Sequence, residues 1–317
     1  MNRTPTISVV IPAYNHGRCI LETLDSVFAQ TYTDYEVIVV NDGSPDDTAE
    51  VLRPLAEGGR IHYFEQPNGG QASARNFGLQ QAQGEFIAYL DDDDLWPPDK
   101  LEWQINILQK TNAVLVGGAA ASFTVGEPSY AQWAPETETL DIDQLAERNP
   151  FLSPGQTLIR HSALKQVGGF DTTVWGADDF DLYLRLAKCG ELRSDRRVGL
   201  HYRIHAENAS RDRGRMLLNC HQVVRRHFPD LGSAVSRKAY RWLYSYAGRE
   251  LSLGAKRAFL KMNIRSTFEN LRNLWIFAPA ALRDIVLTRD ILADLLPGCF
   301  YRWLYASPSS TAVGRAS

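Results

Sequence analysis

Four consecutive aspartates, Asp91 to Asp94, follow the apolar run from Phe86 to Leu90. Carboxylates this close in sequence repel one another unless water or a cation neutralises their charge. Mg²⁺ and Mn²⁺ prefer oxygen ligands, and they combine one or two protein carboxylates with substrate phosphates. The run therefore predicts a divalent cation site that also binds phosphate. The alternative is a solvated acidic turn in which Asp94 starts the helix expected near Pro97.

A second acidic pair, Asp178 and Asp179, precedes the amphipathic pattern that runs from Phe180 to Leu186. Acidic residues are common at helix N-termini, where they cap the helix and interact with its dipole. That structural role is sufficient on its own to explain the pair. Beside a metal–phosphate centre, however, one of these carboxylates could also act as a general base.

A third polar group occurs in "HYRIH", where Arg203 and His205 alternate with apolar residues at an expected strand end. Alternation on a strand makes the two side chains point the same way. Arginine and histidine together suit contacts with a diphosphate or a metal. Simple pairing with the acidic run is the alternative.

The elements that must position these residues alternate between strands and helices over the first hundred residues. Four strands are predicted: "ISVVIP", "YEVIVV", "RIHYFEQ" and "EFIAYL". The first is continuously apolar rather than alternating, which is typical of a buried parallel strand, and the second is also expected to be buried. Helical patterns follow the first three strands, at residues 17–30, 46–55 and 69–82. The pattern predicts an α/β fold whose mostly parallel, twisted sheet is covered by helices on both faces. The polar residues after each strand should then converge on one crevice.

The rest of the chain divides into a second group of elements and a helical end. A helix is expected over residues 100–110, followed by the strand "AVLVGGAAAS" and an irregular insertion at 124–156 with one short helix near 141–147. "QTLIRHSALKQVGGFD" predicts a strand, a helical turn and a Gly-Gly turn, and "RVGLHYRIH" a further strand. We expect a catalytic domain at 1–210, a helical C-terminal region at 211–306 and a disordered tail at 307–317.

Charge is distributed unevenly along a chain of otherwise ordinary composition. Residues 1–200 carry 15 Lys+Arg against 29 Asp+Glu, a net −14, whereas residues 201–317 carry 19 against 8, a net +11. The basic third should therefore face something anionic, which is either the acidic N-terminal part or a membrane surface. Its aromatic segments "NLWIFAPAALRDIVL" and "LLPGCFYRWLYA" suit interfacial helices, or alternatively internal packing or a homo-oligomer interface.

The compartment is predicted from what the sequence lacks. The four cysteines show no paired spacing, which favours neither a zinc site nor disulfides and suits the reducing cytoplasm. No apolar stretch reaches the roughly 18–20 residues of a membrane-spanning helix, and no signal peptide is recognisable. We expect a cytoplasmic protein with at most peripheral membrane contact and no nucleic-acid partner. Dinucleotide-binding, P-loop and nucleophile-elbow motifs are also missing.

Six spaced segments give the sequence a specific resemblance. "SVVIPAYN", "VIVVNDGSPDDT", "NGGQASARNFGL", "EFIAYLDDDDLW", "VGGFD" and "DDFDLYLRL" occur in the order seen in family-two glycosyltransferases of the GT-A fold. The chain resembles that family over roughly residues 5–210. The resemblance implies inverting transfer of one hexose-type sugar from a nucleotide-diphosphate sugar, with a UDP-sugar expected first. The processive Gln-x-x-Arg-Trp signature is missing, because Lys238 stands where glutamine is required.

The same resemblance implies partners and a role for each site residue. The cofactor would be Mn²⁺ or Mg²⁺, the acceptor a saccharide or a lipid-linked saccharide, and the process cell-surface polysaccharide or glycolipid assembly. Asp93 and His205 are expected to bind the metal, and Asp179 to be the catalytic base beside Asp178. Asp91 is expected near the ribose. The implied nucleotide-sugar contacts are Pro12, Ala13, Tyr14, Asn15, Asp42, Arg75, Asp91, Asp92 and Arg203; Asp92 is expected to turn to the other side of the strand exit.

Two other classes of function remain open. An Asp-x-Asp phosphatase or phosphotransferase would use Asp91 as a nucleophile, but that motif usually follows the first strand and here it follows the fourth. A non-catalytic nucleotide-sugar-binding module would need no base, and the presence of Asp91, Asp93 and Asp179 argues against it.

Overall fold

The structure is a computed structural model that describes residues 4–125, 131–134, 137–205, 208, 212–230, 232–244 and 246–247. The chain forms two compact units. The first comprises Met1–Arg211 with Asn219–Ala239, and the second Asp212–Leu218 with Tyr240–Ser317. The predictions for the two basic aromatic segments and for the 307–317 tail concern residues outside the described part.

Within the described residues, nine strands form one sheet in the order β3-β2-β1-β4-β8-β5-β9-β7, with β6 paired to β5. Their bounds are β1 (Ile7–Ala13), β2 (Tyr35–Asn41), β3 (His62–Glu65), β4 (Phe86–Tyr89), β5 (Leu115–Phe123), β6 (Ala131–Trp133), β7 (Thr139–Leu140), β8 (Thr157–Arg160) and β9 (Leu192–Arg203). All pairs among β1 to β4 are parallel, and β5 and β9 run in the same direction as these four. The α/β class with a mostly parallel sheet is confirmed.

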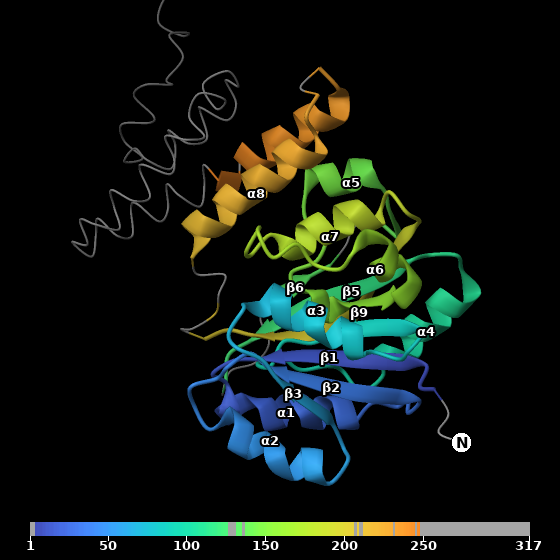
Figure 1. Cartoon of the computed structure of the whole chain (residues 1–317). Coiled ribbons are helices and arrows are strands. Elements are labelled where there is room, and N and C mark those ends of the chain that lie inside the picture. Colours follow the sequence, from blue (N-terminus) through green and yellow to red (C-terminus); the bar gives the residue numbers. More distant parts are fainter. Residues whose placement is uncertain are drawn as a thin grey trace, which may run out of the picture. The chain divides into compact units, whose positions relative to one another are not determined.

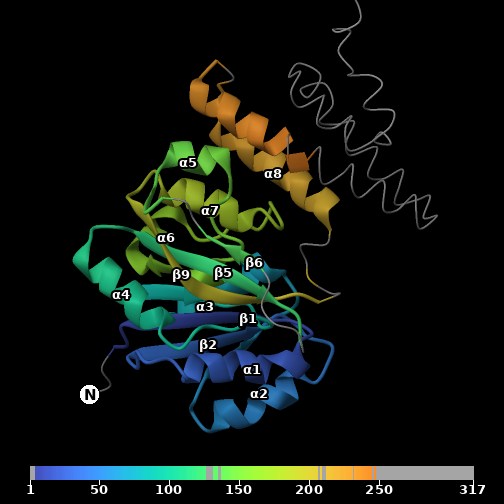
Figure 2. The same cartoon turned by 180° about the vertical axis from the view of Figure 1, so that it is seen from behind.

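Helices cover both faces of this sheet. The described part of the chain contains the helices α1 (Gly17–Phe28), α2 (Thr48–Glu57), α3 (Gln71–Gln81), α4 (Lys100–Lys110), α5 (Ile142–Glu147), α6 (His161–Val167), α7 (Asp178–Leu186) and α8 (Arg213–His227). Figures 1 and 2 show α1 and α2 on one side of β1 and β2, with α3 on the other. No helix in the described part combines the length and the apolar character needed to cross a membrane.

The core explains why these segments adopt these structures. Every residue of β1 is buried, as expected for a strand covered on both faces. Ile20 and Leu24 of α1 pack with Val9 on one face. On the other face, a Cβ at Gly78 of α3 would lie 2.3 Å from Val10 Cγ1, so glycine permits the close approach of α3 to the sheet.

Two parts of the fold differ from the prediction. The insertion contains the short strands β6 and β7 in addition to the expected helix, α5. Helix α4 begins at Lys100 with Asp99 in the N-cap position, so the expectation that Asp94 starts this helix is wrong. Asp94 is instead fully buried, and its Oδ1 accepts a hydrogen bond from the Arg203 amide at 2.8 Å. An antiparallel bridge from Leu95 to β9 holds the chain extended before the helix can begin.

Candidate active site

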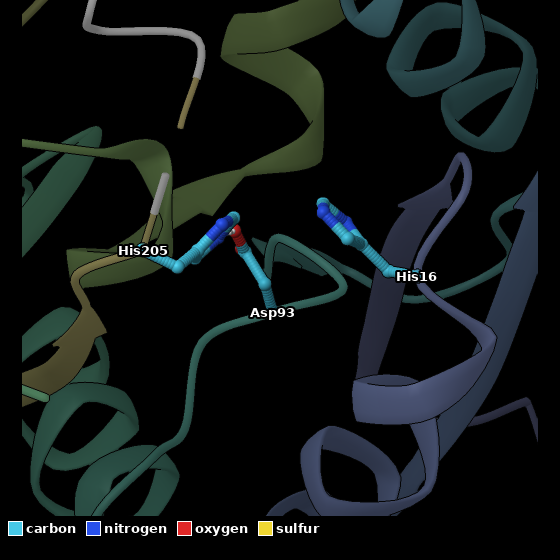
Figure 3. Close-up of side chains that lie close together, drawn as sticks. All are labelled: His16, Asp93 and His205. Carbon is cyan, nitrogen blue, oxygen red and sulfur yellow. Dashed lines mark hydrogen bonds and ion pairs between the residues drawn. The ribbon is translucent and has the colours of Figure 1, made fainter. Parts of the chain in front are cut away.

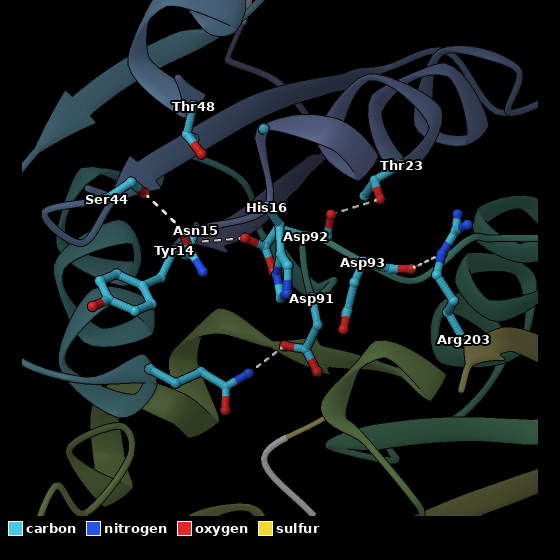
Figure 4. Close-up of polar contacts among 12 residues, drawn as sticks. Tyr14, Asn15, His16, Thr23, Ser44, Thr48, Asp91, Asp92, Asp93 and Arg203 are labelled. Atoms are coloured by element: carbon cyan, nitrogen blue, oxygen red, sulfur yellow. Dashed lines mark hydrogen bonds and ion pairs between the residues drawn. The ribbon is translucent and has the colours of Figure 1, made fainter. Parts of the chain in front are cut away.

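The loops that follow β1, β2 and β4 meet at one edge of the sheet. The Tyr14 amide donates to Asp92 Oδ2 at 2.8 Å, and the Asn15 amide donates to Ser44 Oγ at 3.1 Å (Figure 4). Arg203, at the end of β9, reaches the same loop after β4. Carboxyl ends of parallel strands meet in this way, which explains why residues distant in sequence share one site.

Asp91 is held from both sides by hydrogen bonds from protein side chains. Arg75 Nη2 donates to Asp91 Oδ1 at 2.6 Å, while Nη1 donates to Asp178 Oδ2 at 3.1 Å. Gln71 Nε2 donates to Asp91 Oδ1 at 2.8 Å, and Ser153 Oγ donates to Oδ2 at 3.0 Å. Arg75 is only 2% exposed, so it joins the loop after β4 to the start of α7 inside the protein.

The charge of Arg75 is stabilised by its two carboxylates. Burial lowers the pKa of the guanidinium, but the charges of Asp91 and Asp178 outweigh this effect and raise the pKa above its ordinary value. The guanidinium carbon also lies 5.1 Å from the centre of the Phe170 ring. Arg75 is therefore a permanent cation that neutralises the centre of the site.

Asp179 is the carboxyl group best suited to proton transfer. Its Oδ1 accepts from the Phe180 amide at 2.6 Å, and its Oδ2 accepts from Asn149 Nδ2 at 3.3 Å. Burial, and then the charge of Asp178, raise the pKa of Asp179 to about 7. Burial also raises the pKa of Asp178. A carboxyl group that titrates near neutrality can accept and release a proton under physiological conditions.

Asp93 faces histidines rather than the buried arginine. His205 Nε2 lies 2.7 Å from Asp93 Oδ2, and Figure 3 shows His16 on the opposite side of the same space. The ligand atoms of His16, Asp93 and His205 all lie within 4.8 Å of one another. Imidazole and carboxylate groups are suitable ligands for Mn²⁺ and related divalent ions, so these residues fit a metal.

Arg203 connects this group to the sheet. Its Nε donates to the Asp93 carbonyl at 2.6 Å, and its Nη2 donates to Glu22 at 2.7 Å. The whole side chain is buried, and the guanidinium carbon lies 4.9 Å from the centre of the Phe123 ring. Arg203 thus fixes the loop that carries Asp93, and its expected contact with a diphosphate stays a prediction.

Asp92 binds the loop after β1. Besides the Tyr14 amide, its carboxylate binds His16 Nδ1 at 2.8 Å, and its carbonyl accepts from Thr23 Oγ1 at 3.0 Å. Its expected contact with the nucleotide-sugar stays a prediction. His16 was not among the residues singled out from the sequence. A single histidine in a loop is an unspecific pattern, and its place directly after "PAYN" was the only available signal.

Several of the residues expected around the nucleotide lie at the end of β1 and in the loop that follows it. Pro12 and Ala13 are buried at the end of β1, whereas Tyr14 is 45% exposed. Asn15 has a φ of 60°, which lies in the left-handed region.

Asp42, after β2, is committed to the loop that follows β3. Its Oδ1 accepts from Gln66 Nε2 at 2.6 Å and from the Gly69 amide at 2.9 Å, and its Oδ2 accepts from the Gly70 amide at 2.8 Å. Asp42 therefore fixes the chain just before α3, the helix that carries Arg75.

The sequence profile described as Glycosyl transferase family 2 matches residues 8–168, just over half of the chain. The chain therefore belongs to glycosyl transferase family 2. An uncharacterised glycosyltransferase of Rickettsia bellii is 34% identical over 214 residues, which cover 65% of this chain and 31% of that relative. This chain thus spans about a third of the relative's length.

Two solved structures share the fold. Staphylococcus aureus TarS 1-349 in complex with UDP-GlcNAc has a TM-score of 0.65 at 18% identity, covering 95% of this chain and 86% of TarS 1-349. The mannosyltransferase PcManGT of Pyrobaculum calidifontis, in complex with GDP-Man and Mn²⁺, has a TM-score of 0.56 at 21% identity, covering 96% and 84%. At these identities the likeness concerns the fold.

Proposed function

We propose that the chain is an inverting glycosyltransferase that moves one hexose-type sugar from a nucleotide-diphosphate sugar to an acceptor hydroxyl. The observation that carries this proposal is the position of Asp179. A partly buried carboxyl group with a pKa raised to about 7 adjoins Asp178 and Arg75, and Arg75 contacts Asp91 of the acidic run. General-base assistance of this kind contributes about 10²–10⁴ in rate.

Asp179 acts on the acceptor. It removes the proton from the acceptor hydroxyl while that oxygen attacks the anomeric carbon from the side opposite the diphosphate. The bond to the diphosphate breaks, the diphosphate leaves with the bonding electron pair, and the configuration inverts. Asp178 and Arg75 hold the start of α7, so that the base faces the acceptor in a fixed orientation.

Asp93 and His205 would hold the metal, Mn²⁺ or Mg²⁺. When bound, the ion supplies positive charge beside the leaving diphosphate. Arg203 fixes the backbone of Asp93 and is proposed to contact the same diphosphate. Mn²⁺ in the PcManGT complex supports a metal at this site.

The donor is proposed to occupy the loops after β1, β2 and β4, with Tyr14 and Asn15 at the nucleoside. The UDP-GlcNAc bound to TarS supports a UDP-sugar as the first candidate, while the GDP-Man bound to PcManGT makes guanosine donors the comparison to include. We propose a saccharide or lipid-linked acceptor, a role in cell-surface polysaccharide or glycolipid assembly, and a cytoplasmic location with peripheral membrane contact.

Asp179→Asn tests the base directly. Transfer should fall by about 10²–10⁴ because the amide cannot accept the proton, whereas donor binding measured by calorimetry should stay nearly unchanged. Asp25→Asn, on the exposed face of α1, is the matched control.

The assay uses a panel of UDP- and GDP-sugars with Mn²⁺ present, and simple phosphate esters alongside. Normal turnover by Asp179→Asn would show that the base is assigned wrongly. Hydrolysis of phosphate esters without sugar transfer would favour the phosphatase alternative. Donor binding without any turnover would favour a non-catalytic binding module.

A further inference from the structure

His16 is held in one orientation by a carboxylate that lies behind it. Its Nδ1 is 2.8 Å from Asp92 Oδ1, and its ring meets that of His205 edge to face, with centroids 5.4 Å apart. Figure 3 shows the His16 ring extending from its loop toward Asp93 and His205. These two contacts fix the orientation of the His16 ring, which a histidine with only a solvent-facing role does not require.

The bond to Asp92 decides which ring nitrogen of His16 is available to a ligand. An ionised carboxylate can only accept hydrogen bonds, so Nδ1 must carry the proton. In the neutral ring, Nε2 then carries the lone pair. Metal-binding histidines are oriented in this way, with the second ring nitrogen donating to a carboxylate that fixes the tautomer and makes the ligand more basic.

We propose that His16 is a third protein ligand of the metal, alongside Asp93 and His205, and that Asp92 is the residue that orients it. This inference rests on the proposed function, because the metal it describes is the one placed beside the donor diphosphate. The resulting set is two imidazoles and one carboxylate, and it comes from the loop after β1, the loop after β4 and the segment after β9.

This ligand set has two chemical consequences. Mg²⁺ prefers oxygen ligands, whereas imidazole ligands favour transition ions, so Mn²⁺ and Co²⁺ should bind more tightly than Mg²⁺. Three protein ligands also permit the metal to bind before the donor arrives. The contact between His205 Nε2 and Asp93 Oδ2 would then give way to bonds from both atoms to the metal.

Asp92 further connects the metal to the nucleotide loop. The Asp92 carboxylate, which orients His16, also accepts a hydrogen bond from the Tyr14 amide. Tyr14 lies in the loop after β1, where the nucleoside is proposed to bind. Asp92→Asn can keep the bond to the Tyr14 amide through its oxygen while presenting an NH₂ donor to His16. That donor favours the opposite tautomer, in which the proton sits on the nitrogen needed by the metal.

The test is a titration of the full chain with Mn²⁺ in the absence of nucleotide, with free Mn²⁺ measured by electron paramagnetic resonance. His16→Ala should weaken binding by more than about tenfold, and Asp92→Asn by about 10–100-fold. His62→Ala is the matched control, because the His62 side chain is 61% exposed on β3, and its affinity should equal that of the wild type. Wild-type affinity for Mg²⁺ should be at least about tenfold weaker than for Mn²⁺.

A spectroscopic count of ligands separates coordination from a merely structural role. Pulsed electron paramagnetic resonance on protein containing ¹⁵N-histidine should detect two imidazoles on Mn²⁺ in the wild type and one in His16→Ala. One imidazole in the wild type, or unchanged affinity in His16→Ala, overturns the proposal.

Failure of this inference can be distinguished from failure of the proposed function. Mn²⁺ that binds only together with UDP, and equally well to wild type and His16→Ala, overturns the role of His16 but leaves the glycosyltransferase proposal intact. If the wild type binds no Mn²⁺ with or without UDP, both the role of His16 and the metal-dependent part of the proposed function are wrong.

Discussion

Asp91 and Asp93 are two residues apart, but their carboxylates lie in contrasting surroundings. Asp91 contacts the buried cation Arg75 and, through it, Asp178. Asp93 contacts His205 and faces His16, two side chains whose charge depends on pH and on bound metal. The Asp91 side thus already has a cation that the protein supplies, whereas the Asp93 side can accept a cation from solution. One acidic run therefore places two carboxylates against different partners.

The largest effect should come from removing the cation on the Asp91 side. Arg75→Met leaves the buried carboxylate of Asp178 and the partly buried carboxylate of Asp91 without their partner, and breaking a buried pair in this way costs about 3–5 kcal/mol. Urea unfolding monitored by circular dichroism measures the change. Arg53→Met, on the exposed surface of α2, should change stability by less than about 0.5 kcal/mol. Equal stability of the two variants would contradict a buried neutralising role.

A reciprocal pair of substitutions tests the division between the two sides. Asp93→Asn should weaken Mn²⁺ binding by more than about 100-fold with little change in the unfolding midpoint, since a metal ligand is lost. Asp91→Asn should lower the unfolding midpoint and retain Mn²⁺ affinity within a few-fold. Calorimetric titration and thermal unfolding of both variants provide the comparison, and identical profiles would show that the run acts as a single site.

A further prediction concerns the pH dependence of stability. A free aspartate has a pKa of about 3.9, whereas that of Asp179 is raised to about 7 in the folded chain. The folded state therefore binds the proton more tightly, so stability is lost as pH rises above about 4 and the loss is complete above about 7.

Asparagine cannot ionise, so Asp179→Asn should unfold at a higher temperature than the wild type at pH 8, with no difference at pH 4. Differential scanning calorimetry across this range measures the shift. A shift that is independent of pH would exclude the ionisation of Asp179 as its cause.

Much of the fold could be predicted because its signals are local. Continuous apolar runs predicted β1, β2 and β4, and apolar spacing predicted α1 and α7, within a few residues of their observed bounds. The insertion of β8, antiparallel, between β4 and β5 could not be predicted, since strand order depends on contacts between distant segments. Strands β6 and β7, which pair with β5 and β9, are too short to show a hydrophobic pattern in the sequence.

The site was harder to predict than the fold. Alternation along a strand suggested that Asp91 and Asp93 face the same way, but a turn follows β4 and the Asp94 amide donates to the Asp91 carbonyl at 3.2 Å. That turn sends the two carboxylates to different partners. His16 could not be identified because a lone histidine acquires meaning only when a second ligand, 189 residues later in the numbering at His205, lies beside it.

The bonds that join Arg203 and His205, at and just after the end of β9, to earlier parts of the chain have a consequence for folding order. The partners Asp93 and His205 are 112 residues apart, and Glu22 and Arg203 are 181 apart. During synthesis the first four strands emerge well before β9, and closing such long loops carries an entropic cost that must be met before the contacts form. The acidic run is therefore synthesised early, whereas its partners Arg203 and His205 are synthesised late. A nascent chain that ends before β9 should carry the carboxylates without the histidine and arginine that fix them, so that metal binding reports the arrival of the last strand.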